Sequence, residues 1–392
     1  MKKPIFIAPV VYSFMEKHEK QKVSIYAQAD HKFWTGSFFV SNPRYGTWDN
    51  NPVWDFAIPD RAIGPDLSNT TNLSFEEVTD QRAHEFKSII NQTGKRVVLF
   101  WSGGIDSTVV LAALIKNLSP TELAMVDIVM TNESYYENPL FFEKFIRNSK
   151  FNIIDFYEMN SRFQNDSTLL NSCIITDGVP ADKLWVVERI LHYAAIHGPR
   201  VLTESYKTSK SELINFAASY MGNAINAEHF VDLVFNNIEE TNAPIETVAD
   251  FFYWINFNYH WIGHIYMYYA NTLAGDPANL SLYNTASMPW YETHDYQRWS
   301  FSQQAVTARN ITNMRDYKML AKQYIYSLDK NNYYMMLRTK TGSPTKAFGQ
   351  DKISPIFQST AALFDDGTIV RSHKEGDVRN FIDQYCLRLK RD

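Results

Sequence analysis

The chain has 392 residues, of which 45% are hydrophobic and 21% charged, and this composition excludes disorder over most of the length. Its 38 Lys and Arg against 43 Asp and Glu give a formal net charge of -5, with no block of like charge. That balance argues against a duplex-binding protein held mainly by phosphate neutralisation. The length exceeds one typical domain of about 150 residues, so we expect two domains or one elaborated α/β domain.

The cysteines and the N-terminus predict a cytoplasmic protein. Cys173 and Cys386 are far apart and form no CxxC pair, which argues against a disulfide framework and a structural zinc site. No cleavage site of the signal-peptide type follows the short apolar run at the start. Residues 251–273 lack charges, but their polar residues favour a buried helix over a membrane span, and we expect no membrane association. This stretch carries His260 and His264 one helical turn apart, without an evident third metal ligand.

Regular structure is first predictable at Ser74, after an irregular strand-containing segment, residues 1–72, to which we assign no fold. Ser74-Phe75-Glu76-Glu77 is a capping box, and the apolar spacing after it predicts a helix that ends near Gly94. The run 96–101 then predicts a buried strand, and a turn of glycine and serine leads from it into an apolar helix at 109–115.

Strands and helices continue to alternate along the chain. A helix is predicted at 139–148, and the further predicted strands are 124–130, 153–157 and 173–176. This alternation indicates an α/β fold with a parallel sheet, right-handed crossovers and helices on both faces. An aromatic-rich helical region follows from 181 to about 279. The expected domains are thus the segment 1–72 and one domain over 73–392.

The turn after the first predicted strand carries the clearest chemical signal, with the sequence Ser102-Gly103-Gly104-Ile105-Asp106-Ser107-Thr108. Two glycines let backbone N–H groups approach a phosphate, and the following helix directs its positive end at the same point. The turn lacks the lysine of a GxxxxGK[ST] loop and is not GxGxxG. An ordinary tight turn would explain the glycines but not the serines and aspartate beside them, although Asp106 alone also suits a first helical turn.

Residues 102–107 resemble the SGGxDS pyrophosphate loop of the N-type ATP pyrophosphatases, which have an adenine nucleotide alpha hydrolase-like fold. The chain is most similar to the synthetase domain of class B asparagine synthetase and its relatives, the β-lactam and carbapenam synthetases and the lasso-peptide cyclases. Residues 177–185 resemble the family's GxGxDExFxGY loop, with Lys183 in place of an acid, and 286–293 resemble E-x-R-x-P-F-L-D without its arginine. Residues 317–320 and 336–342 resemble the K-x-x-L-R and R-x-K segments, so the resemblance covers roughly 74 to 350.

The resemblance implies an enzyme that uses ATP and Mg²⁺ to adenylate a carboxylate, releasing pyrophosphate, before an amine displaces AMP to form an amide or lactam. It implies a small-molecule or peptide carboxylate and an amine donor as substrates. Catalytic roles fall to Asp106 and Asp182, which would also bind the metal, and to Lys340, with Lys346 as the alternative lysine. Glu133 is a candidate for metal or ribose, or an exposed loop acid. The implied nucleotide-binding residues are Ser102, Gly103, Gly104, Ile105, Asp106, Ser107, Thr108, Met130, Thr131, Asn132, Asp177 and Gly178.

One departure from the family bears on the nitrogen source. Class B asparagine synthetases begin, after Met1, with a cysteine that hydrolyses glutamine, whereas position 2 here is Lys2. We therefore expect no glutaminase of its own, with ammonia or a substrate amine as the nucleophile. Two alternatives stay open: an enzyme of the same loop type that adenylates a nucleobase carbonyl in RNA or a nucleotide, and a non-catalytic nucleotide-binding homologue. Nucleic acid is not the favoured partner.

Overall fold

The structure is a computed structural model that describes residues 64, 66–67, 71–185, 188–221, 224–241, 243–261, 285–309, 317–337, 361–363 and 369–371. Packing divides the chain into two compact units. The sheet unit comprises Leu73–Val179, Pro277–Tyr291 and Met314–Asp392, and the aromatic unit comprises Met1–Asn72, Pro180–Asp276 and Glu292–Asn313. Most of the segment 1–72 lies outside the described residues.

Four parallel strands form the sheet, in the order β3-β2-β1-β4. Their bounds are β1 Arg96–Phe100, β2 Val126–Met130, β3 Asn152–Asp155 and β4 Cys173–Asp177. β1 is central and pairs with β2 and β4, which explains why Val97, Val98 and Leu99 form a continuous buried run. Beyond β4, the backbone N–H of Met288 donates to the Ile175 carbonyl at 2.7 Å, so a segment more than a hundred residues later extends the sheet. The predicted α/β fold with a parallel sheet is confirmed.

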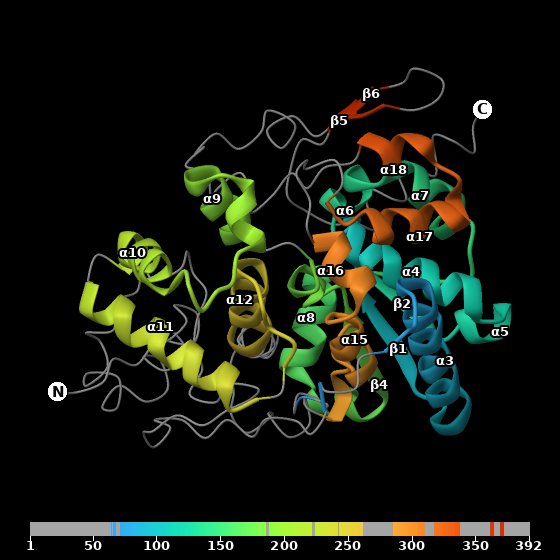
Figure 1. Cartoon of the computed structure of the whole chain (residues 1–392). Helices are drawn as coiled ribbons and strands as arrows, with labels where there is room; N and C mark the ends of the chain where they lie inside the picture. The colour runs from blue at the N-terminus through green and yellow to red at the C-terminus, as the bar shows by residue number, and fades with distance from the viewer. Residues whose placement is uncertain are drawn as a thin grey trace. The chain divides into compact units, whose positions relative to one another are not determined.

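Helices cover the sheet on two sides. After β3 the chain crosses back past β2 and β1 to reach β4, and a right-handed crossover in that direction puts its helix on the face opposite to α4. Figure 1 shows α8 on one side of the strands and α3 with α4 on the other. The helical elements of the sheet unit are α3 Phe75–Thr93, α4 Ile105–Asn117, α5 Pro120–Leu123, α6 Asn132–Glu137, α7 Pro139–Phe141, the π turn η3 Phe142–Ile146, α8 Phe156–Asn165, the 3-10 turn η4 Ser167–Asn171, α17 Met319–Asp329 and α18 Asn332–Leu337. A separate antiparallel pair joins β5 Ala361–Leu363 to β6 Ile369–Arg371.

The first helix begins and ends as the sequence predicts. The backbone N–H of Ser74 donates to the Glu77 carboxylate at 2.7 Å, and the Ser74 hydroxyl accepts from the Glu77 N–H at 3.2 Å. The bond from the Ser74 backbone lowers the pKa of Glu77. At the other end, Gly94 adopts φ +66°, and its N–H donates to the Ile90 carbonyl.

The third predicted strand is shorter than expected. β3 ends at Asp155, whose carboxylate accepts from the N–H groups of Tyr157 and Glu158 at 2.8 and 3.1 Å. Asp155 is therefore the N-cap of α8, and the apolar residues Phe156 and Tyr157 belong to the helix and not to the strand.

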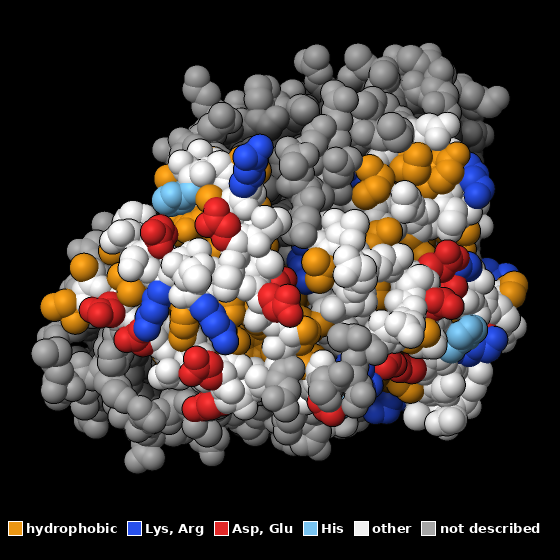
Figure 2. Space-filling view, in the orientation of Figure 1, with side chains coloured by type: hydrophobic (Ala, Val, Ile, Leu, Met, Phe, Trp, Pro, Cys, Tyr) orange, Lys and Arg blue, Asp and Glu red, His pale blue; other side chains and the backbone are white. Residues whose placement is uncertain are grey.

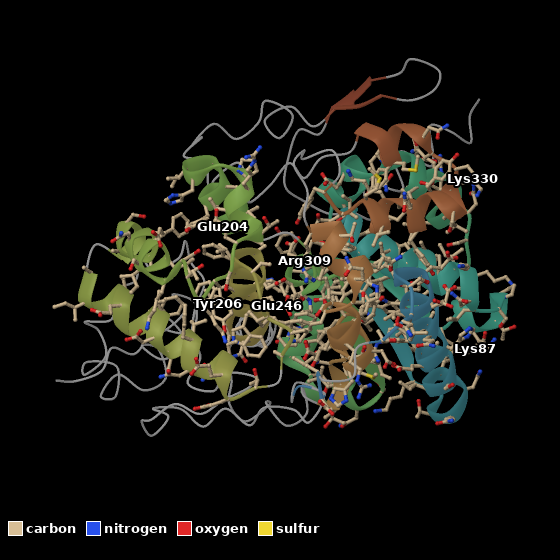
Figure 3. All side chains as sticks on the ribbon, viewed as in Figure 1. Lys87, Glu204, Tyr206, Glu246, Arg309 and Lys330 are labelled. Atoms are coloured by element: carbon tan, nitrogen blue, oxygen red, sulfur yellow. The ribbon has the colours of Figure 1, made fainter. Side chains whose placement is uncertain are left out.

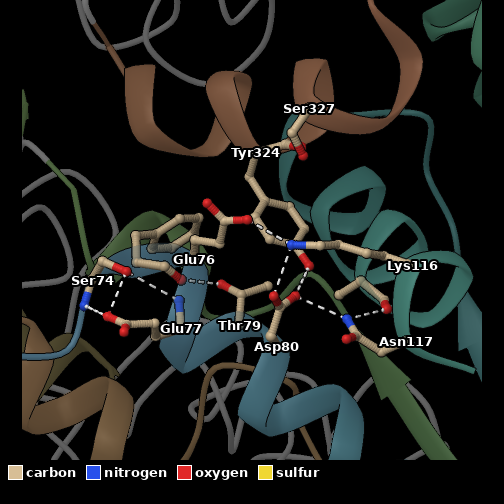
Figure 4. A network of polar contacts seen from close by, with 11 residues as sticks. Ser74, Glu76, Glu77, Thr79, Asp80, Lys116, Asn117, Tyr324 and Ser327 are labelled. Carbon is tan, nitrogen blue, oxygen red and sulfur yellow. Dashed lines mark hydrogen bonds and ion pairs between the residues drawn. The ribbon is translucent and has the colours of Figure 1, made fainter.

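A polar network fixes α17 against α3 and α4 (Figure 4). The Lys116 ammonium of α4 donates to Glu76 at 2.6 Å and to Asp80 at 2.7 Å, both on α3. The Tyr324 hydroxyl of α17 donates to the same Asp80 carboxylate at 2.5 Å, and Asn117 donates to it at 2.9 Å. Asp80 thus receives donors from both neighbouring helices, which sets the position of α17 along α4.

The aromatic unit is helical, and its core consists mainly of ring contacts. Its elements are the 3-10 turn η5 Ala181–Lys183, α9 Glu188–His197, the 3-10 turn η6 Pro199–Thr203, α10 Lys210–Met221, α11 Ala224–Glu239, α12 Val248–Ile255, the π turn η7 Asn256–His260, α15 His294–Trp299 and α16 Gln303–Arg309. Tyr193 packs edge-on against Phe216, with ring centroids 5.0 Å apart, and Phe252 lies 5.3 Å from Tyr193. The predicted aromatic helical region is confirmed over its described residues.

Short backbone contacts connect the helices of the aromatic unit. Figure 3 labels Glu204, Tyr206 and Glu246, which lie where two loops meet. The Tyr206 N–H donates to the Glu246 carbonyl at 3.2 Å, and the Val248 N–H donates to the Glu204 carbonyl at 2.9 Å. The predicted buried stretch 251–273 is described up to Trp261, and it is buried through Asn258 and at Trp261. Within the described ranges, every helix is too short or too polar to span a bilayer.

Candidate functional site

The strand order creates a topological switch point between β1 and β4. The chain runs from β1 outward to β2 and β3 and then returns to β4 on the other side of β1. In open parallel sheets, ligands bind at the carboxyl ends of the strands that flank such a point. Ser102 to Gly104 follow β1, and Gly178 follows β4. The topology therefore selects the same residues as the sequence pattern does, and it does so without reference to any motif.

Only glycine fits the turn at Gly103. Its φ is +74°, and a Cβ there would lie 2.1 Å from the carbonyl oxygen of Ser134. Gly104 is the N-cap of α4 and has no side chain to cap the helix. The first bond of the helix runs from the Thr108 N–H to the Gly104 carbonyl at 3.0 Å. The N–H groups of the residues before Thr108 make no bond within the helix, and such N–H groups at a helix N-terminus favour a bound anion.

Two hydroxyls lie at the same turn. The Ser107 oxygen accepts from the Ser102 N–H at 3.1 Å, and the two hydroxyl oxygens are 3.0 Å apart. Ser102 is exposed, whereas Ser107 is buried at 3% exposure. Ser102 is therefore the hydroxyl that a ligand can reach directly, and Ser107 holds the turn closed beneath it.

The other loop residues support the turn from inside. The Thr108 hydroxyl accepts from the Trp101 indole N–H at 3.1 Å and lies 3.4 Å from the Gly103 carbonyl, to which it donates. Thr108 and Ile105 are buried, so any contact that they make with a ligand comes from the backbone. These side chains position the turn against the core.

The loop after β4 contacts the first turn of α4. A Cβ at Gly178 would lie 2.6 Å from the Ser107 nitrogen and 2.9 Å from the Asp106 Cβ. Asp177 is buried, and its carboxylate accepts from the Val179 N–H at 2.9 Å, which closes the loop tightly. Glycine at 178 thus allows the ends of β1 and β4 to form one backbone-lined edge.

Asp106 is held by a lysine from a distant part of the sequence. The Lys318 ammonium lies 2.5 Å from each carboxylate oxygen of Asp106, and the Lys318 side chain is only 2% exposed. The Tyr291 hydroxyl donates to the Asp106 backbone carbonyl at 3.0 Å. The sequence includes Lys318 in a family-like K-x-x-L stretch, but no local signal pairs it with Asp106, 212 residues away.

The end of β2 adjoins the same loop. Met130 is buried, and Thr131 is the N-cap of α6, where its N–H donates to the Ser134 hydroxyl at 3.2 Å. Ser134 also supplies the carbonyl that crowds Gly103. Asn132 begins α6, and its side chain, like that of Glu133, lies outside the described residues. The structure thus brings the β2 end beside the β1 turn.

The segment 286–291 is anchored by an arginine that the sequence analysis missed. Arg82, a buried residue of α3, donates to the carbonyls of Pro289 and Trp290, both at 3.1 Å. Trp290 also stacks on Phe86 of the same helix, with ring centroids 5.1 Å apart. Phe86 and Arg82 lie one turn apart on α3, and this spacing was the signal in the sequence that both side chains lie on the same face of the helix. These contacts hold the segment that extends the sheet beyond β4.

The other predicted site residues belong to the aromatic unit or lie outside the described residues. Asp182 lies in η5 of the aromatic unit. Lys340, Lys346 and His264 lie outside the described residues, as does the side chain of His260. Within the described part of the chain, no three His, Cys, Asp or Glu side chains are grouped as metal ligands.

The described cysteine is not a reactive thiol. Cys173 begins β4 and is buried, and burial raises the pKa of its thiol to about 11. A neutral buried thiol is a poor nucleophile near pH 7. Cys386 lies outside the described residues.

Comparison of the chain with protein-family models, with curated proteins and with solved structures finds no match.

Proposed function

We propose that the protein is an ATP-dependent synthetase that forms AMP and pyrophosphate by adenylating a carboxylate for amide or lactam formation. The observation that carries this proposal is the turn 102–107, which begins α4 at the switch point between β1 and β4. Gly103 and Gly178 let the loop backbone pack closely against α6 and against the first turn of α4. The N–H groups of that turn and the Ser102 hydroxyl are the natural partners of a pyrophosphate.

The proposed reaction explains why such an edge is needed. A carboxylate is a poor electrophile, so one of its oxygens attacks the α-phosphorus of ATP, and the bond from that phosphorus to the bridging oxygen of pyrophosphate breaks. An amine nitrogen then attacks the acyl carbon, AMP leaves with its oxygen, and the amine loses a proton. Negative charge develops on the departing pyrophosphate, and N–H donors fixed before the reaction stabilise it without reorganisation.

The remaining parts of the site are assigned by the same proposal. The end of β2, at Met130 and Thr131, is suited to contact adenine through backbone atoms and an apolar surface. Lys340 is proposed to stabilise the transition state of adenylation. ATP brings Mg²⁺ on its phosphate oxygens, and within the sheet unit the expected protein ligand of that metal is Asp106.

The alternative reaction on a nucleobase is narrowed by two observations. The raised thiol pKa of Cys173 disfavours it as a sulfur carrier, so thiolation is the weaker form of that alternative. Among the described side chains visible in Figure 2, basic and acidic residues are interspersed and form no basic stripe for a nucleic-acid backbone. Amination of a free nucleotide base stays as the second candidate reaction.

The test measures nucleotide products. The purified chain is incubated with ATP, Mg²⁺ and fractionated metabolites, and AMP and pyrophosphate are quantified beside Ser102→Ala. We expect both products in at least one fraction, and a fall of about tenfold or more in Ser102→Ala, since an exposed donor to the leaving group is removed.

Ser172→Ala is the matched control, because Ser172 is exposed and directly precedes β4 at the opposite edge of the sheet. Its hydroxyl donates to the Leu169 carbonyl, and its loss should leave the rate unchanged. Formation of ADP alone would refute the proposal. ATP binding without turnover in every fraction would favour the non-catalytic alternative.

A further inference from the structure

The ion pair between Lys318 and Asp106 has an unusual location. Asp106 is in the first turn of α4, where the pyrophosphate of the proposed function would bind, and its side chain is 22% exposed. The ammonium of Lys318 lies 2.5 Å from both carboxylate oxygens and 5.3 Å from the centre of the Tyr317 ring. The carboxylate thus faces solvent in part, while its counter-charge comes from the protein side.

The backbone of Lys318 is held in a conformation that places this ammonium. Lys318 is the N-cap of α17, with φ 57° and ψ 32°, whereas N-cap residues ordinarily adopt the extended region. A left-handed lysine is costly and persists only where its surroundings fix it. Here the Asp80 network fixes α17 against α4, and the Lys318 carbonyl accepts from the Lys322 N–H at 3.0 Å.

The charge of Lys318 changes how an anion would interact with the first turn of α4. A bare carboxylate at the first turn of α4 would repel a bound pyrophosphate, and Asp177 at the end of β4 adds a second acid nearby. An ammonium on both Asp106 oxygens cancels the nearer charge. A magnesium ion at about 2.0–2.1 Å from these oxygens would also be repelled by an ammonium 2.5 Å from each of them, so the described geometry does not favour Asp106 as a metal ligand.

We propose that Lys318 is a positioning residue that neutralises Asp106, so that the loop binds pyrophosphate without a metal ion on that carboxylate. This inference rests on the proposed function and changes one part of it: Asp106 becomes the partner of a resident ammonium. A metal ion carried by the nucleotide would then be bound by phosphate oxygens and not by Asp106.

The test uses the full chain with inorganic pyrophosphate, titrated by calorimetry in EDTA and in Mg²⁺. Wild type is expected to bind in EDTA. Lys318→Met should weaken that binding about tenfold or more, because Asp106 is left negatively charged beside the ligand. Mg²⁺ should restore much of the loss, since the freed carboxylate can then bind the metal. Lys318→Arg keeps the charge and should stay within about threefold of wild type.

A double variant separates this role from a structural one. In Asp106→Asn with Lys318→Met both charges are gone, so affinity in EDTA should return to within about threefold of wild type. Lys330→Met is the control, because Lys330 lies at the other end of α17, also left-handed, and is exposed (Figure 3). Its affinity should equal that of wild type, and thermal unfolding of every variant checks the fold.

The opposite results would overturn the inference. If Lys318→Met binds like wild type in EDTA while Asp106→Asn loses tenfold in Mg²⁺, Asp106 is a metal ligand. Failure of the double variant to recover affinity would mean that Lys318 acts only on structure. A wild type that binds neither pyrophosphate nor ATP in either buffer would remove the proposed function itself, and this inference with it.

Discussion

An ion pair lies at each end of the strands of the parallel sheet, the amino edge and the carboxyl edge, but the two pairs join different kinds of partners. At the amino edge, Arg96 of β1 donates to Asp127 of the neighbouring β2 at 2.8 and 2.5 Å, and Asn152 of β3 adds a third bond at 3.0 Å. At the carboxyl edge, Asp106 meets a lysine from the far end of the sequence, beside two glycines. The pair at the amino ends joins adjacent strands and stabilises the sheet. The pair at the carboxyl ends lies beside glycines that leave the loop backbone without side chains.

The largest effect should come from adding one methyl group at the carboxyl edge. Gly103→Ala places a Cβ 2.1 Å from the Ser134 carbonyl oxygen at a positive φ, so the loop or α6 must move. We expect a loss of about 3 kcal/mol or more in the free energy of unfolding, measured in urea.

Gly94→Ala is the control for Gly103→Ala. Gly94 also has a positive φ, but nothing lies within 4 Å of its missing Cβ. That change should cost about 1 kcal/mol and leave pyrophosphate affinity unaltered. Equal costs for the two variants would show that the turn at Gly103 is not crowded as described.

A smaller effect is expected at the amino edge. Asp127→Asn removes the carboxylate charge to which Arg96 and Asn152 both donate, and it should lower the free energy of unfolding by about 2 kcal/mol. Glu158→Gln, in the exposed pair with Arg162, should change it by less than about 0.5 kcal/mol. Neither change should alter pyrophosphate affinity, and a loss of affinity in Asp127→Asn would contradict the division of roles between the edges.

The smallest effect is a pH dependence near the start of β2. The N–H of Ser119 and the Asn91 amide bond to Glu122 and lower its pKa from 4.5 to about 2. Since the folded pKa is depressed, this stabilisation is complete above about pH 4.5 and is lost as pH falls towards 2. The melting temperature of Glu122→Gln should therefore lie below that of wild type at pH 6, and the two should converge near pH 2. A constant difference would contradict the assignment.

Local signals in the sequence predicted much of the sheet unit. The capping box at Ser74, the buried run of β1 and the glycine turn each lie within a few residues, and each is present in the structure as expected. The second strand begins at Val126 and not at 124, because Pro120–Leu123 forms a short helix capped by Ser119. Here too the missed signal was local.

Contacts between distant residues could not be predicted in the same way. The pairing of Met288 with Ile175, the bonds from Arg82 to 289–290 and the Lys318–Asp106 pair join residues separated by more than a hundred positions. No periodicity or capping rule encodes such partners. The K-x-x-L resemblance drew attention to the right stretch, but only the packing of α17 on α4 supplies the geometry.

The extension of the sheet by residues 287–288 also has a consequence for synthesis on the ribosome. Until that segment emerges, the outer edge of β4 presents unpaired backbone groups, and α17 with its lysine has not yet been made. Residues 73–179 must therefore wait for roughly a hundred further residues, about 5–20 s at typical elongation rates, before β4 is paired, and for roughly 150 before α17 is complete. A nascent chain stalled before 288 would expose the unpaired backbone groups of β4, to which a strand of another chain can bind. This interval is therefore the period of greatest aggregation risk.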